Sequence, residues 1–185
     1  GGDTRLFRTL YHEGPEYIPH LRTAQSLWRE LEHDSGTELL DLTGGLMLAP
    51  PSHPGMLSIL AGVDQYDLPH EILSVDELRS RFPAINFIDD EVGVWDPGTG
   101  VLRSNLSVLV TAAQAEAHGA ELLSYHRVTA LDSDPDGVTV SAEGRTFRVR
   151  RVLVAAGPWA TTLLPELRNS ALVTTKRWWS RIQIR

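Results

Sequence analysis

The residue types best suited to chemistry lie near the two ends of the chain, and the first group is a pair of arginines. Arg5 and Arg8 are three positions apart, and on a helix this spacing puts both side chains on one face, which Tyr11 would continue. A planar guanidinium group binds a carboxylate through two parallel hydrogen bonds. The pair therefore suits a carboxylate substrate, although a solvated surface turn would account for the same spacing.

The second group is a run of small residues late in the chain. The apolar residues 152–155 predict a strand that is buried on both faces. Ala156 and Gly157 then leave room for a ligand or a backbone, and Pro158 suits the first turn of a short helix that ends at Pro165. Ligands of open α/β sheets bind beyond the carboxyl ends of strands, so a phosphate-bearing cofactor would fit here. A turn that needs its glycine only for packing is an equal alternative.

Composition excludes several functional classes. The chain has 185 residues, of which 42% are hydrophobic and 22% are charged, as in a soluble globular protein. A net charge of −7 without a long Lys/Arg run argues against nucleic-acid binding, and no apolar run approaches the roughly 18 residues of a membrane helix. Cysteine is absent, which excludes disulfides and a cysteine nucleophile. We therefore expect a cytoplasmic protein without nucleic-acid or membrane partners.

Other common active-site patterns are missing from the sequence. The seven histidines lack the close spacing of a metal site, so no metal is expected. There is no Gly-x-Ser-x-Gly elbow, no Walker loop and no Gly-x-Gly-x-x-Gly fingerprint. The arginine pair and the small-residue turn are the two candidates that remain.

Hydrophobic periodicity and turn signals predict the elements that position these candidates. Helices are expected over residues 15–33, 56–63, 75–82 and 105–118. Ser74 with Glu77 forms a capping box, and Ser104 is expected to cap the last of these helices. Strands are expected over residues 38–42, 46–49, 71–73, 91–95, 121–124, 128–131, 137–141, 146–149 and 152–155. Residues 38–42 and 46–49 should form a hairpin, and the order as a whole predicts an α/β fold with α+β character.

Short motifs along the chain are similar to those of one enzyme family, in the same order. They span residues 2–8, 11–14, 27–32, 43–46, 78–83, 96–102 and 152–159. The chain resembles the monomeric sarcosine oxidase and N-methyltryptophan oxidase family of D-amino-acid-oxidase-like FAD-dependent oxidoreductases. The resemblance implies a partial FAD-binding domain, residues 1–36 and 103–165, with an inserted piece of a mixed-sheet substrate domain, residues 37–102 and 166–185.

The resemblance also implies roles for two catalytic arginines. Arg5 matches the arginine close to the flavin ring, where a fixed positive charge favours the reduced, anionic flavin. Thr4 would lie beside the same ring. Arg8 matches the arginine that holds the substrate carboxylate.

The remaining cofactor-binding residues come from the second half of the chain. Val128 matches a strand residue near the adenosine half of FAD. Ala156, Gly157 and Trp159 belong to the turn that passes close to the cofactor.

The implied reaction is the oxidation of a secondary amino acid such as sarcosine or an N-methyl amino acid. Hydride passes to the flavin, and O2 is reduced to H2O2. Glycine oxidase, a D-amino-acid dehydrogenase and a non-catalytic remnant that serves as a binding module are the alternatives. The family's glycine fingerprint and its carboxyl half have no counterpart, Gly1 replaces a histidine, and residues 169–185 follow the family poorly. We therefore expect a fragment that is inactive alone and binds FAD weakly.

Overall fold

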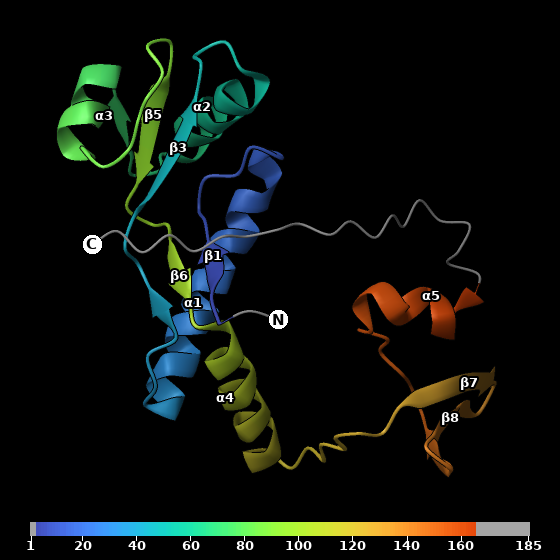
Figure 1. The fold of residues 1–185 in the computed structure, drawn as a ribbon. Helices are drawn as coiled ribbons and strands as arrows, with labels where there is room; N and C mark the ends of the chain where they lie inside the picture. Colours follow the sequence, from blue (N-terminus) through green and yellow to red (C-terminus); the bar gives the residue numbers. More distant parts are fainter. Residues whose placement is uncertain (1–2, 166–185) are drawn as a thin grey trace. The chain divides into compact units, whose positions relative to one another are not determined.

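The computed structural model describes residues 3–165, which form two compact units divided between Glu121 and Leu122 (Figure 1). The first unit contains β1 (Arg5–Phe7), η1 (Pro15–Tyr17), α1 (Ile18–Ser35), β2 (Leu40–Asp41), β3 (Gly45–Ala49), α2 (Pro54–Tyr66), β4 (Glu71–Leu73), α3 (Val75–Arg81), β5 (Val92–Asp96), β6 (Gly100–Leu102) and α4 (Ser104–Ala117). The second contains β7 (Val128–Asp134), β8 (Gly137–Ala142), β9 (Arg145–Val149), η2 (Gly157–Trp159) and α5 (Ala160–Leu163). Helices and antiparallel sheets are mixed, as the α/β prediction with α+β character requires.

The start of the chain is a strand, and neither the helical arginine face nor the surface turn that the spacing allowed describes residues 5–7. β1 pairs antiparallel with β6, with Leu6 opposite Val101. A short segment gains its backbone hydrogen bonds from a neighbouring strand without the cost of starting a helix. Because residues 5–7 are extended and Arg8 lies after the strand, the shared helical face of Arg5 and Arg8 does not form.

The predicted hairpin between residues 38–42 and 46–49 was also wrong, although both strands exist. β2 pairs with β6 in the order β1-β6-β2, and β3 pairs with β5 in the order β3-β5-β4. Residues 40–49 therefore lie antiparallel to residues 92–102 along their length, with a break between the two pairs of strands, and do not fold back on themselves. We call this long antiparallel pair the ribbon. Gly44, at φ 78°, donates its N–H to the Thr99 carbonyl at 2.9 Å and joins the two halves of this ribbon.

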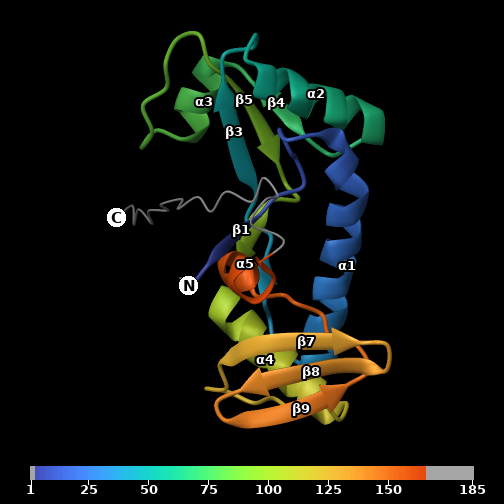
Figure 2. The ribbon, with the colours of Figure 1, turned by 90° about the vertical axis from the view of Figure 1, so that its right-hand side faces the viewer.

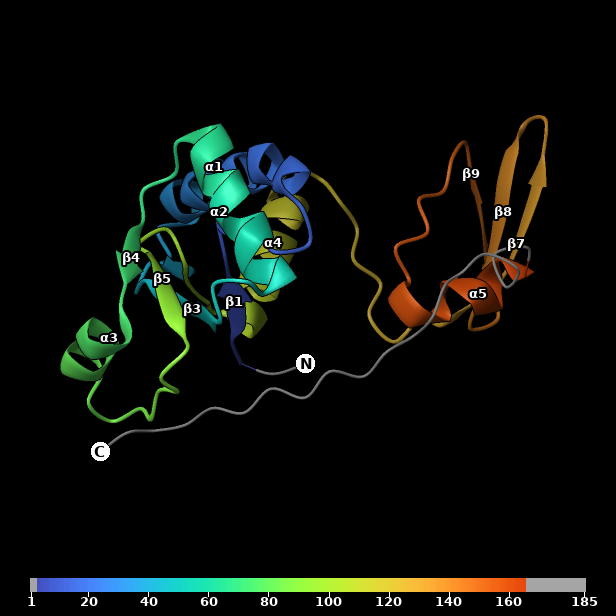
Figure 3. The same cartoon turned by 90° about the horizontal axis from the view of Figure 1, so that it is seen from above.

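The β3-β5-β4 sheet has a helix on each face, as Figure 3 shows. Val94 of β5 packs with Met56, Ile59 and Val63 of α2 on one face. On the other face, a Cβ on Gly93 would lie 2.6 Å from Leu78 Cδ2, so α3 approaches the strand at a position without a side chain. The alternation predicted for this strand is the reason that both faces are filled.

The local helix signals are confirmed for α1 and α3. The helical pattern of this segment predicts an apolar stripe of Tyr17, Leu21, Ala24, Trp28 and Leu31. The last four are half-buried, whereas Tyr17, which precedes α1, is 47% exposed. Gly36 ends the helix at φ 65°. The capping box of α3 has both of its hydrogen bonds.

The long helix α4 departs from its prediction in two ways. Ser104 is its first residue rather than its cap. Helical spacing predicts an apolar stripe of Leu106, Leu109, Val110, Ala113 and Ala117 on this helix. Of these residues, Leu109 is 67% exposed, and Ala113 and Ala117 are also exposed. The stripe is thus only partly covered within residues 3–165.

The second unit is built on the meander β7-β8-β9, seen in Figure 2. The predicted strands at 128–131, 137–141 and 146–149 are confirmed, and Arg148 of β9 reaches Asp134 of β7 at 2.5 Å. Two other predicted strands were wrong. Residues 121–124 and 152–155 are irregular, and Leu153 is 93% exposed. An apolar run becomes a buried strand only beside partner strands, and none pairs with residues 152–155 in the part of the chain that the structure describes.

Among the described helices, none combines the length and the apolar character that crossing a membrane requires. The expected tail at 166–185 and the residue at position 1 lie outside the described residues.

Candidate functional site

Arg8 follows β1 directly and is the better enclosed of the two candidate arginines. Its side chain is 19% exposed, and its Nη2 lies 3.6 Å from Glu13 Oε1. The guanidinium carbon lies 4.5 Å from the centre of the Tyr11 ring. Glu13 Oε2 is in turn 3.2 Å from His12 Nδ1. Arg8 therefore faces the carboxylate of Glu13, and its role at a substrate carboxylate stays a prediction.

Arg5 is the first residue of β1, an edge strand of the β1-β6-β2 sheet. It is opposite Leu102 of β6, it is exposed, and its Nη1 donates to the Thr4 carbonyl at 2.8 Å. Thr4 is half-buried beside it. A guanidinium on an exposed strand position can offer a fixed positive charge to a ligand.

Behind the arginine segment lies a buried carboxylate that the sequence indicated only as part of a turn. Asp96 ends β5 and is 1% exposed. It accepts hydrogen bonds from Thr9, Gly98 and Thr99. These bonds connect the residue after Arg8 to the turn between β5 and β6.

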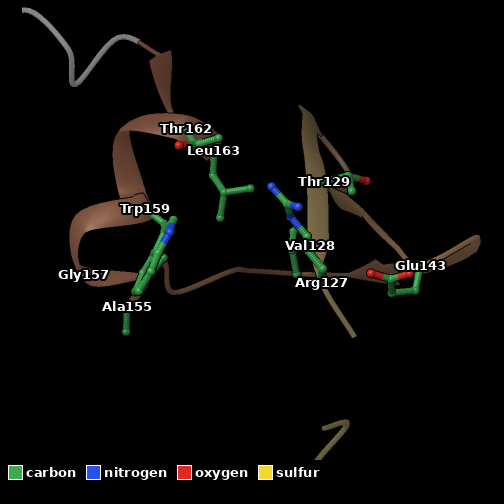
Figure 4. Close-up of a pocket in the computed structure, with 10 residues that line it drawn as sticks. Arg127, Val128, Thr129, Glu143, Ala155, Gly157, Trp159, Thr162 and Leu163 are labelled. Atoms are coloured by element: carbon green, nitrogen blue, oxygen red, sulfur yellow. The ribbon is translucent and has the colours of Figure 1, made fainter. Parts of the chain in front are cut away.

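The second unit has a pocket of about 1080 Å³ between β7 and the turn that leads into α5 (Figure 4). The side chains of Leu163 and Arg127 point toward one another across it. Its lining residues are Arg127, Val128, Thr129, Glu143, Ala155, Ala156, Gly157, Trp159, Thr162 and Leu163. All four cofactor-binding residues expected from this half of the chain, Val128, Ala156, Gly157 and Trp159, thus line one pocket.

Comparison with known proteins identifies the family. Residues 1–182 match the family described as FAD dependent oxidoreductase. The chain belongs to this family of FAD-dependent oxidoreductases.

Two curated relatives of the chain are N-methyl-L-tryptophan oxidases. The chain is 36% identical over 166 residues to the N-methyl-L-tryptophan oxidase of Citrobacter koseri, covering 90% of this chain and 45% of that protein. It is 34% identical, with the same coverage, to the N-methyl-L-tryptophan oxidase of Yersinia pestis strain Pestoides F. The chain therefore spans about half the length of the curated relatives that it matches.

Solved structures of two other oxidases share the fold. NikD, an unusual amino acid oxidase essential for nikkomycin biosynthesis, superposes in its open form with a TM-score of 0.78 at 26% identity, over 90% of this chain and 43% of NikD. Glycine oxidase from Geobacillus kaustophilus superposes with a TM-score of 0.66 at 24% identity, over 82% of this chain and 43% of that chain. The second match supports the fold alone.

The pocket of the second unit fits part of an FAD molecule. Gly157 has φ 53°, a left-handed conformation that favours glycine, and nothing lies within 4 Å of the place where its Cβ would be. The backbone of this turn is thus open to a ligand, and the volume matches the upper range of small-molecule sites, about 1,000 Å³. Arg127 adds a positive charge at the wall.

Two residues of the first unit, Glu13 and Asp96, were not singled out for chemistry from the sequence. Glu13 contacts Arg8 across a loop, where no helical or strand period relates the two residues. Tyr11, which the helical spacing grouped with the arginines, does contact Arg8, although this segment is not a helix. Asp96 was visible only as a turn residue. Its signal was an acidic residue followed by Pro97-Gly98, since an Asp in this position often accepts hydrogen bonds from the turn.

Proposed function

We propose that this chain forms part of an FAD-dependent oxidase of secondary amino acids, with an N-methyl amino acid as the substrate class. The observation that carries the proposal is the 36% identity over 90% of the chain to an N-methyl-L-tryptophan oxidase. The enclosed Arg8 supports it, because an arginine beside a carboxylate and an aromatic ring suits the carboxylate end of an amino acid.

In this proposal the residues of the first unit bind the substrate and lie beside the flavin ring. Arg8 binds and orients the substrate carboxylate. Arg5 holds a positive charge beside the reduced ring, with Thr4 next to it. Bound FAD would supply hydride acceptance from the carbon beside the amine and electron transfer to O2, giving H2O2.

The residues of the second unit hold the cofactor. Val128 lies beside the adenosine half, while Ala156, Gly157 and Trp159 line the approach of its central part. We assign residues 1–36 and 103–165 to the FAD-binding domain and residues 37–102 and 166–185 to the substrate domain. This domain assignment remains a prediction, as do the cytoplasmic location and the absence of nucleic-acid and membrane partners.

Peroxide release tests the activity. The full-length protein that contains this chain should reduce O2 to H2O2 on addition of sarcosine or an N-methyl amino acid. Exchange of Arg8 for Met should raise KM much more than it lowers kcat, because it removes the carboxylate contact. Substrate oxidation without oxygen uptake would favour a dehydrogenase, and no flavin-dependent turnover of any amino acid would overturn the proposal.

The 185-residue chain itself should bind FAD weakly and should not turn over. Flavin absorbance that remains with the purified chain, together with peroxide release on addition of sarcosine, would contradict this expectation.

A further inference from the structure

Asp96 is a buried carboxylate whose hydrogen bonds reach the segment that carries Arg8. Its Oδ2 accepts from Thr9 Oγ1 at 2.7 Å, from the Thr9 N–H at 3.3 Å and from Thr99 Oγ1 at 2.6 Å. Its Oδ1 accepts from the Gly98 N–H at 2.8 Å. The four donors are uncharged, and a buried carboxylate needs such bonds to offset its loss of water.

The packing around these four residues leaves little freedom. A Cβ on Gly98 would lie 2.9 Å from Thr9 Oγ1, and a Cβ on Gly45 would lie 2.1 Å from Thr99 Cγ2. Close approach of the backbone at both glycines allows the two threonine hydroxyls to reach one carboxylate oxygen. We refer to Thr9, Asp96, Gly98 and Thr99 as the Asp96 cluster.

The Asp96 cluster fixes the backbone just after Arg8, whereas strand β1 fixes it just before Arg8. Phe7 is buried at the end of β1, opposite Gly100, and Leu10 is buried in the core beneath α2. Thr9 is fixed by both its N–H and its hydroxyl. With residues 7, 9 and 10 held, the backbone is fixed on both sides of Arg8, whose half-buried side chain lies beside Glu13.

We propose that Asp96 is the positioning residue for Arg8. Its carboxylate holds Thr9 and thereby sets the backbone from which the guanidinium reaches Tyr11, Glu13 and a bound carboxylate. The part that concerns a bound carboxylate rests on the proposed function. The coupling between Asp96 and the position of Arg8 does not.

The negative charge is needed, and not only the shape of the side chain. An asparagine at position 96 has one acceptor oxygen, whereas the cluster presents donors to both oxygens of Asp96. The NH2 group of the asparagine side chain would therefore face a hydrogen-bond donor of the cluster in place of an acceptor. Asp96→Asn should loosen Thr9 or the turn at Gly98, even though it preserves volume.

The NMR signals of the Arg8 side chain test the coupling in the full 185-residue chain. Because the Tyr11 ring lies 4.5 Å from the Arg8 guanidinium carbon, its ring current shifts these signals away from their free values. In Asp96→Asn and in the isosteric Thr9→Val, the shifts should fall toward free values. Thr9→Ser keeps the hydroxyl and should restore them.

A control separates positioning from general loss of stability. Ser74→Ala removes the cap of α3 in the same unit without touching the Asp96 cluster, and should leave the Arg8 shifts unchanged. If Asp96→Asn does not fold, Thr9→Val decides the matter. Unchanged Arg8 shifts in a folded Asp96→Asn or Thr9→Val chain would overturn the proposal, as would equal changes in Ser74→Ala.

Titration with acetate tests the link to binding. Acetate should move the Arg8 signals of the unaltered chain, and Thr9→Val should weaken its binding by about tenfold, the equivalent of one hydrogen bond to a charged group. Absence of any acetate effect on the unaltered chain would count against the carboxylate role of Arg8 and leave the coupling result intact. Equal acetate affinity in both chains, with Arg8 shifts also unchanged, would show that Asp96 serves stability alone.

Discussion

Glu32 joins α1 to the sheet that carries the two arginines, and its removal should destabilise the first unit. Its Oε1 accepts hydrogen bonds from the N–H groups of Leu39 and Leu40, both at 2.7 Å. Its Oε2 accepts from Arg29 at 2.6 Å. Leu40 begins β2, which pairs with β6, the strand that also pairs with β1.

The expected loss follows from these bonds. The Glu32 side chain is 12% exposed, so the two N–H groups would not regain full hydration when it is removed. At about 1.5 kcal/mol for each hydrogen bond to a charged acceptor, Glu32→Ala should lower the free energy of unfolding by about 3 kcal/mol. Glu32→Gln keeps one acceptor oxygen and loses mainly the pair with partly exposed Arg29, so about 1 kcal/mol is expected.

The same contacts predict the effect of pH. Burial alone would raise the pKa of Glu32, but the hydrogen bonds from Leu40, Leu39 and Arg29 outweigh it and hold the pKa below its ordinary value of 4.5. The stabilisation is therefore complete above the ordinary pKa and is lost as the pH falls through the lower pKa of the folded state.

Urea unfolding followed by tryptophan fluorescence measures both effects, at about pH 7 and about pH 3. Glu30→Gln, an exposed change in the same helix, is the matched control. The reasoning would be refuted if Glu32→Ala behaved like Glu30→Gln. It would also be refuted if the difference between Glu32→Ala and the unaltered chain were the same at both pH values.

Three further changes test individual contacts. Glu13→Gln should raise the affinity of Arg8 for acetate by a few fold, because an ion pair that is still partly open to solvent contributes up to about 1 kcal/mol; unchanged affinity in a titration would refute a competition between the two carboxylates. Gly157→Val should weaken FAD binding, measured by flavin fluorescence, because it adds bulk in the open turn and strains a residue at φ 53°; Gly144→Val, also at positive φ but at a different turn, is the control. Arg148→Met should raise the pKa of Asp134, which a hydrogen bond from Arg148 now holds below its ordinary value. Carboxyl NMR titration reads that change directly, and an unmoved pKa would show that the pair does not form in solution.

Local signals in the sequence were sufficient for several elements of the fold. The capping box at Ser74 and Glu77 predicted where α3 begins, and the run at 71–73 predicted β4 with its observed bounds. Both signals act between residues a few positions apart, so no knowledge of the rest of the fold is needed.

Such local signals did not predict which distant segments pair with one another. A glycine pair at Gly44-Gly45 is typical of a hairpin, yet these residues join two strands that pair with partners 43 to 62 positions further along the chain. The hydrogen bond from Thr9 to Asp96 spans 87 positions. The sequence predicted a turn at 96–100 but contained no periodic pattern that would connect it to Thr9.

Residues 152–158 contain both a signal that acts locally and one that depends on distant partners. Gly157 and Pro158 predicted a turn into a short helix, and η2 and α5 follow it as expected, because these preferences are set by the residues themselves. The preceding residues 152–155 predicted a buried strand and are irregular, because a strand is defined by its neighbours. The small residues of this run still line the pocket with Val128. Their value for a ligand therefore depends on the lack of side-chain bulk in the turn and does not require the strand that the apolar pattern suggested.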